Sequence, residues 1–173
     1  KISGLKDPAQ NLLNDTLLQF VRFKLHPYDV VINEFMADPS PQVGLPEKEF
    51  IELYNTLPFA FSVENIRLLI NSHEYQLPEK TIDSAGYLII CDIQDYDRFS
   101  SHGNTLGIQS MAALTNTSGS IELRDTTGEI LDSLQYYQFW YGNEEKAQGG
   151  YSLARVDALN TCGASMNWQA SED

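Results

Sequence analysis

Three glutamates in two short segments have the residue type and spacing that acid–base chemistry requires. Glu34 lies in the first segment, and Glu49 and Glu52 lie in the second. Two carboxyl groups about 5 to 9 Å apart carry out glycoside hydrolysis. Glutamates on strands also accept hydrogen bonds from loop backbone, and Asn33 and Asn55 are suited to bonding turn amides. We therefore expect these five residues to be structural and the chain not to be an enzyme.

Asp92, Asp95 and Asp97 bring three carboxylates together in one short segment. Clusters of oxygen ligands attract Ca²⁺. The segment lacks the glycine and the later bidentate glutamate of an EF-hand loop. We therefore expect a solvated acidic loop and no bound metal, with a calcium site as the alternative.

The densest aromatic cluster in the chain precedes a polar Gly-Asn-Glu-Glu segment. It consists of Tyr136, Tyr137, Phe139, Trp140 and Tyr141. Aromatic faces stack on sugar rings and anchor protein interfaces. One hypothesis is a binding surface formed by Tyr136, Trp140 and Tyr141. The alternative is that Tyr137 and Phe139 belong to the core and Trp140 covers one end of the fold.

The cysteines and histidines show no catalytic or metal-binding pattern. Cys91 and Cys162 are the only cysteines and form no Cys-x-x-Cys motif, which excludes a zinc or thioredoxin-like site. They are expected to be buried free thiols, and a single disulfide is the alternative. His26, His73 and His102 are scattered along the chain and are expected at the surface. We expect no cofactor.

Composition limits the class of partner. The chain has 173 residues, of which 42% are hydrophobic, enough for one domain with a full core. Its 24 acidic and 11 basic residues give a net charge of −13. This charge, without a cluster of Lys or Arg, opposes binding to nucleic acid and to anionic lipid. No apolar run approaches the ~20 residues of a transmembrane helix. We therefore expect neither nucleic-acid binding nor membrane insertion.

From Tyr28 onward, apolar and polar residues alternate in short runs separated by turn residues. This period of two indicates an all-β, antiparallel sandwich or barrel. The run at 86–91 is apolar on both faces, which predicts a central strand between two layers. The predicted strands cover 29–36, 49–55, 65–70, 73–77, 86–91, 120–124, 129–134 and 151–156, with another around Asn167-Trp168. One helical turn is expected within 95–102, and an exposed loop at 138–148.

Residues 1–27 form an N-terminal extension before the predicted domain at 28–173. Asp7-Pro8 could begin a helix in this extension. The alternation of apolar and polar residues over 21–26 is instead typical of a strand, and 7–11 would make the turn before it. We favour a hairpin, with a helix as the alternative.

The order and spacing of these segments resemble the lamin tail domain. This family is an immunoglobulin-like antiparallel β-sandwich found at the C-terminus of nuclear lamins and in many bacterial surface and secreted proteins. The resemblance runs over most of Asp29 to Asp173. It rests on 32–35 followed by Asp38-Pro39, and on 49–55, 86–90, 114–125, 128–132 and 150–155. The insertions at 39–41 and 44–47 look like the bacterial branch. Lys1 to Leu25 is similar to the closing hairpin of a preceding bacterial immunoglobulin-like module.

The resemblance implies no common catalytic residue and no cofactor. It implies structural roles for the polar and glycine residues of its motifs, namely Asn33, Glu34, Glu49, Glu52, Asn55, Gly119, Asp125, Gly128, Asp132, Gly150 and Arg155.

These observations favour a non-catalytic structural, adhesion or anchoring module of a larger bacterial protein. We expect it outside the cytoplasm, whether secreted, periplasmic or at the cell surface. The expected partners are other domains of the same polypeptide, and a cell-surface protein or polysaccharide. The alternative is an accessory carbohydrate-binding domain attached to a secreted hydrolase.

Overall fold

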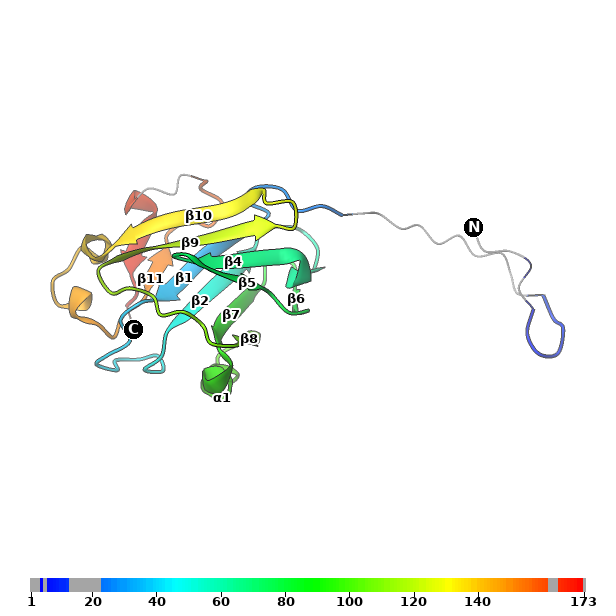
Figure 1. The fold of residues 1–173 in the computed structure, drawn as a ribbon, viewed down its shortest axis with the longest axis horizontal. Helices are drawn as coiled ribbons and strands as arrows, with labels where there is room; N and C mark the ends of the chain where they lie inside the picture. Colours follow the sequence, from blue (N-terminus) through cyan, green and yellow to red (C-terminus); the bar gives the residue numbers. More distant parts are fainter. Residues whose placement is uncertain (1–3, 5, 13–22, 162–164, 173) are drawn as a thin grey trace.

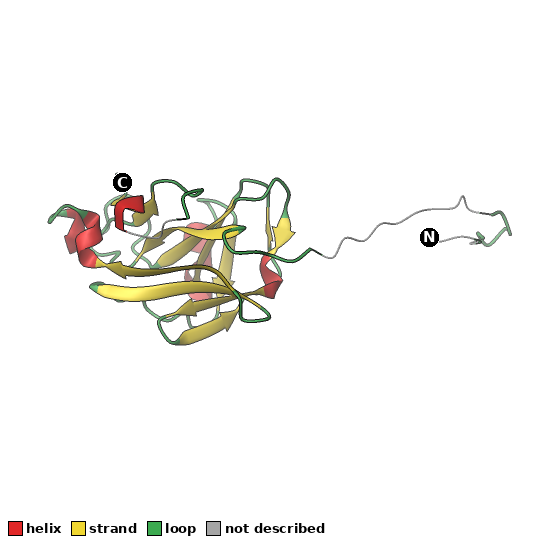
Figure 2. Cartoon of the chain, turned by 90° about the horizontal axis from the view of Figure 1, so that it is seen from above, coloured by secondary structure: helices red, strands yellow, loops and turns green. Residues whose placement is uncertain are grey.

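The computed structural model describes residues 4, 6–12, 23–161 and 165–172. Its strands form two main β-sheets that face each other across a shared hydrophobic core (Figure 1). Helices are confined to short turns (Figure 2). The predicted all-β sandwich is confirmed.

The larger sheet has six strands in the order β12-β11-β1-β2-β7-β8. Its strands are β1 (Val30–Met36), β2 (Phe50–Asn55), β7 (Tyr87–Asp92), β8 (Thr105–Ile108), β11 (Leu153–Arg155) and β12 (Trp168–Ala170). Strands β7 and β8 run parallel, with Ile89 opposite Thr105. This corrects the expectation of a purely antiparallel fold. The chain crosses back after β7 through short helical turns, so that β8 runs in the same direction as β7.

The smaller sheet has four strands in the order β10-β9-β4-β5. Its strands are β4 (Ile66–Ile70), β5 (His73–Gln76), β9 (Ser118–Asp125) and β10 (Ile130–Tyr137). Both predicted hairpins, β4–β5 and β9–β10, are confirmed. The pair β3 (Phe61–Ser62) and β6 (Thr81–Ile82) was not predicted, because two residues are too few to show alternation.

Short helical turns connect several strands. They are η1 (Val63–Asn65), η2 (Ile93–Asp95), α1 (Tyr96–Phe99), η3 (Gln138–Tyr141), η4 (Lys146–Gln148) and η5 (Ser165–Asn167). The helical turn predicted within 95–102 is confirmed by α1. The exposed loop predicted at 138–148 is wrong in part, because η3 carries two buried aromatic residues.

Alternation along the strands builds the core. On β2, Ile51 and Leu53 face the smaller sheet and are fully buried, while Glu52 between them is only partly buried. On the facing sheet, Leu68 and Ile121 are fully buried. These residues belong to one contiguous cluster. Burial of this apolar surface is the main stabilising contribution, at about 25 cal/mol per Å².

A second apolar cluster lies on the outer face of β7. Ile89 and Cys91 face this side, and Phe99 of α1 covers them together with Phe50 and Met36. Figure 1 shows α1 beside β7 and β8, away from the smaller sheet. The structure therefore confirms that β7 is apolar on both of its faces and lies between two layers.

Gly150 allows two loops to approach closely. Its φ is +83°, and a Cβ at this position would lie 2.2 Å from the carbonyl oxygen of Pro41. Its backbone N–H donates to the Asp38 carbonyl at 2.8 Å. Any side chain here would push the proline-containing loop away from the end of the sandwich.

The described part of the N-terminal extension contains a turn. The Asp7 carboxylate accepts hydrogen bonds from the backbone N–H groups of Ala9 and Asn11, at 2.8 and 2.9 Å. Lys6 and Leu12 form an antiparallel bridge around it. This is the turn predicted at 7–11, whereas the choice between hairpin and helix after it falls on residues 13–22, outside the described residues.

A buried ion pair links the two sheets. The Arg155 guanidinium on β11 donates to Asp132 Oδ2 on β10 at 2.6 Å, and both side chains are almost fully buried. Ile32 of β1 completes the arrangement: its N–H donates to Asp132 at 2.8 Å, and its carbonyl accepts from Arg155 Nε at 2.8 Å. Burial is the largest effect on Asp132 and raises the pKa of this carboxyl, while Arg155 opposes the rise.

We expect Asp132→Asn to lower the free energy of unfolding by about 3 to 5 kcal/mol, because it leaves the Arg155 charge buried without a counter-charge. Urea denaturation measures this change. The matched control is Glu74→Gln, which breaks the exposed Arg67–Glu74 pair at 3.2 Å and should cost less than about 1 kcal/mol. Equal losses in the two variants would contradict the central role of the buried pair.

Candidate functional site

Asn55 holds two loops together at one end of β2. Its side chain is fully buried. The amide nitrogen donates to the carbonyls of Phe59 and Asp83 at 2.9 and 2.8 Å, and the amide oxygen accepts from the N–H of Leu57 at 2.8 Å. Every polar atom of this side chain is therefore engaged in satisfying loop backbone.

Two acidic residues of the family-type motifs also bind loop backbone. Glu49 accepts from the N–H of Leu114 at 2.9 Å, and burial raises the pKa of Glu49. Asp125 accepts from the N–H groups of Thr127 and Glu129, at 2.8 and 2.9 Å. These bonds close the β9–β10 turn, in which Gly128 has a φ of +90°. Donation from the Thr127 hydroxyl is the largest effect that lowers the pKa of Asp125.

Glu34 and Glu52 form a carboxyl pair on the outer face of the larger sheet, where they are directly opposite in the β1–β2 register. A bulge at Asn33 lets its amide donate to Glu52 Oε1 at 2.9 Å, and the Ser152 hydroxyl donates to Glu34. Burial, with a smaller contribution from the Glu34 charge, raises the pKa of Glu52 to about 7. Glu52 and His102 both line a cavity of about 340 Å³. Of the described carboxyl groups, Glu52 comes closest to what acid–base chemistry requires.

The aromatic side chains predicted to form a binding surface lie in the interior. The exposed fractions of Tyr136, Trp140 and Tyr141 are 1%, 9% and 7%, whereas those of Tyr137 and Phe139 are 37% and 71%. The assignment of Tyr136 and Tyr141 to an exposed surface is therefore wrong, and Trp140 contributes only a small exposed part, which lines a groove on the smaller sheet. The alternative that Tyr137 and Phe139 are core is also wrong.

The strand register explains the inward direction of Tyr136. Tyr136 pairs with Gly119 on β9, and its hydroxyl donates to the carbonyl of Thr115 at 2.9 Å. A Cβ at Gly119 would lie 2.6 Å from that hydroxyl oxygen. The glycine therefore provides the space that the buried tyrosine ring fills.

The aspartates considered for calcium make separate contacts. Asp92 accepts from the N–H groups of Gln94 and Met111, both at 2.9 Å. Asp95 pairs with Lys48 at 3.5 Å and with Arg98 at 3.4 Å, and Asp97 is exposed. Within 6–12, 23–161 and 165–172, no three His, Cys, Asp or Glu side chains are grouped to hold a metal ion. The arrangement does not support the calcium alternative.

Cys91 is a buried free thiol, and burial raises its pKa to about 11. Cys162, the other cysteine of the alternative disulfide, lies outside the described residues. The three histidines, His26, His73 and His102, are exposed.

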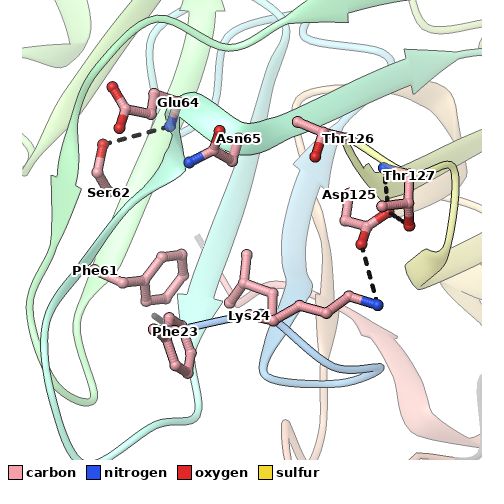
Figure 3. A pocket seen from close by; sticks show the side chains of 10 residues that line it. Phe23, Lys24, Phe61, Ser62, Glu64, Asn65, Asp125, Thr126 and Thr127 are labelled. Carbon is pink, nitrogen blue, oxygen red and sulfur yellow. Dashed lines mark hydrogen bonds and ion pairs between the residues drawn. The ribbon is translucent and has the colours of Figure 1, made fainter. Parts of the chain in front are cut away.

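A cavity of about 620 Å³ lies where the N-terminal extension joins the sandwich (Figure 3). Lys24 crosses this cavity toward Asp125, and its ammonium lies 3.6 Å from Asp125 and 2.6 Å from Glu129. The Phe23 ring packs edge-on against Phe59, with ring centroids 5.0 Å apart. Leu25 is buried in the main core. We call Phe23, Lys24 and Leu25 the strap.

The sequence pattern does not reveal the attachment of the strap. The alternation over 21–26 predicts a hairpin of a preceding module, whereas the strap packs against the sandwich itself. The contacts that attach it come from turns far away in sequence, such as the β9–β10 turn, so no local signal could identify them.

Comparison with protein families identifies a family that this chain matches. The lamin tail domain family matches residues 26–138, which is more than half of the chain. The chain belongs to the lamin tail domain family. A search of curated proteins gives no significant match.

The lamin tail domain match ends before β11 and β12. The motif at 150–155, on which the resemblance also rested, lies outside the matched residues. The structure nevertheless pairs β11 with β1, with Glu34 opposite Ala154. The sandwich of this lamin tail domain therefore includes strands beyond the matched region. None of its described short helices has the length and apolar character needed to cross a bilayer.

We expect the free energy of unfolding of the wild type to fall as pH rises from about 4.5 to about 7, because Glu52 loses its proton over this range. Its folded-state pKa of about 7 exceeds the ordinary value of 4.5, so the folded state binds this proton more tightly. The stabilisation is complete below pH 4.5 and is lost above pH 7. Glu52→Gln should flatten this part of the curve of unfolding free energy against pH. Glu79→Gln removes one exposed charge as a control, and identical pH curves for wild type and Glu52→Gln would refute the prediction.

Leu25→Ala tests the attachment of the strap. Because Leu25 is buried in the core, we expect a loss of about 2 to 5 kcal/mol in the free energy of unfolding. The control is Leu12→Ala, whose side chain is exposed and should change stability by less than about 0.5 kcal/mol. If urea denaturation showed no difference between the two variants, the strap would not be packed in solution.

Proposed function

We propose that this lamin tail domain is a non-catalytic structural, adhesion or anchoring module of a larger bacterial protein that is secreted or displayed at the cell surface. The observation that carries the proposal is the use of its polar motif residues. Asn55, Glu49 and Asp125 bond to loop backbone, and Asp132 and Arg155 bond to each other across the two sheets. Side chains committed in this way maintain the shape of the module and are not free to act on a substrate.

The strap supports a role within a longer polypeptide. Leu25 is inserted in the core, and Lys24 pairs with Glu129. Tyr28 then donates its backbone N–H to Leu131 at 2.7 Å. A chain that is held at three successive points transmits force and orientation from whatever precedes it. We propose the other domains of the same polypeptide as the first partners.

The net charge supports a role without nucleic acid or inserted lipid as partner. The net charge of −13 keeps the module soluble at high concentration and repels polyanions. The insertions at 39–41 and 44–47 support assignment to the bacterial branch. A cell-surface protein or polysaccharide is the external partner that this proposal includes.

A second candidate function is an accessory carbohydrate-binding domain attached to a secreted hydrolase. A specific observation favours it: the rings of Tyr137 and Phe139 are exposed and stacked on each other, with centroids 5.5 Å apart and 20° between their planes. Exposed, pre-positioned aromatic faces are suited to sugar rings. The candidate residues are thus these two and no longer Tyr141, which is buried, while Trp140 lies behind Tyr137.

The location can be tested on intact cells of the organism that produces the chain. Antibodies raised against the 173-residue chain should label unpermeabilised cells or detect the protein in the medium. Antibodies against a cytoplasmic enzyme serve as the control for lysis. Labelling that appears only after permeabilisation would overturn the extracytoplasmic assignment.

One experimental result would contradict the assignment of the chain as non-catalytic. Turnover of a glycoside by the purified chain that disappears in Glu52→Gln, at unchanged thermal stability, would show that the carboxyl pair is catalytic.

A further inference from the structure

The outer face of the smaller sheet contains a shallow groove of about 570 Å³. Tyr137, Gln135 and Ser133 alternate with buried residues along β10 and point to this outer side. Across the sheet, Ser120 is opposite Gln135. The β4–β5 turn contributes Asn71. The groove thus combines one aromatic end with a row of amide and hydroxyl groups.

The aromatic end has rigid support from the core. Tyr137 packs against Trp140 with ring centroids 6.4 Å apart, and Trp140 stacks on Trp168 at 6.2 Å. Trp168 in turn contacts the fully buried Phe35 at 5.5 Å. A ring backed by packed rings has little rotamer freedom left to lose when a ligand covers it. Tyr137 is therefore a pre-positioned aromatic ring at the end of the groove, and Phe139 stacks on it from outside the groove lining.

The polar groups next to this surface retain hydrogen-bonding capacity. Asn71 Oδ1 accepts from the N–H of Ser120 at 3.0 Å, which fixes the orientation of its amide. In the part of the chain that the structure describes, the Asn71 amide nitrogen and the Gln135 amide form no hydrogen bond. Residues two apart on a strand are about 7 Å apart, so Gln135 lies one step along β10 from the aromatic surface.

The charges that line the groove compensate each other. Arg124 pairs with Glu122 on the same face of β9. On the neighbouring strands, Arg67 pairs with Glu74 at 3.2 Å. The groove is therefore locally neutral although the chain carries a net charge of −13. A neutral ligand with many hydroxyl groups and one apolar face fits this lining better than an anion or a cation does.

We infer that this groove binds a neutral oligosaccharide, with one sugar ring stacked on Tyr137 and the next ring bonded by Gln135 and Asn71. The inference deepens the second candidate function and rests on it. The competing occupant is an extended peptide, because β10 is an edge strand of its sheet and could pair with another strand.

The test is binding of the full chain to an array of soluble neutral polysaccharides, including a β-glucan, a xylan and a mannan, by titration calorimetry. Binding should be saturable and change little between ~0.15 and 0.5 M salt, because no charge is involved. Tyr137→Ala and Gln135→Ala should each weaken it about tenfold or more. The matched control Phe59→Ala removes an exposed phenylalanine outside the groove and should bind like the wild type.

Each other result has a distinct meaning. Saturable binding that both groove variants leave unchanged overturns this site but keeps the carbohydrate-binding function. No binding to any neutral polysaccharide overturns both the groove site and the carbohydrate-binding function. The proposal of a structural, adhesion or anchoring module is not affected by this result. Binding only to acidic polysaccharides, or only to extended peptides with loss in Tyr137→Ala, overturns the neutral-sugar assignment of the groove.

Discussion

The buried pair of Asp132 and Arg155 is the constraint on which the sandwich depends. It joins β10 of one sheet to β11 of the other, and the backbone of Ile32 between them is bonded to both side chains. The Arg155 guanidinium also lies over the Trp168 ring, 5.2 Å from its centroid. Two charges removed from water are stable only while they remain together, so this pair tolerates one relative placement of the sheets. An apolar core of the same size would allow more freedom.

The series of packed aromatic rings at the end of β10 depends on this placement of the two sheets. Trp168 sits between the ion pair and Trp140, and Tyr136 fills the space that Gly119 leaves open. The buried rings in turn support Tyr137 and Phe139, which reach the surface. The exposed aromatic surface is therefore an extension of the core, and its rigidity is a consequence of how the sheets are joined.

The outer face of the larger sheet is organised by a different interaction. The bulge at Asn33 directs its amide toward Glu52, and Ser152 bonds to Glu34 from the neighbouring strand. Both carboxyl groups are partly buried, and burial raises the pKa of Glu52. The strap attaches at another part of the molecule, close to the β9–β10 turn. The carboxyl pair thus lies on the larger sheet, whereas the aromatic groove and the contacts of the strap lie at different ends of the β9–β10 hairpin.

Sequence alone determined the alternation, the hairpins and the family, because a period of two and turn residues are local signals that depend on a few neighbouring positions. It also located the aromatic cluster at 136–141. Only the tertiary structure decided which of those rings are buried, since the direction of each side chain depends on the pairing of β10 with β9 and on the turn into η3. The parallel strand β8 and the attachment of Leu25 likewise required contacts with distant residues. Local patterns specify how a strand alternates, whereas its neighbours decide which side faces water.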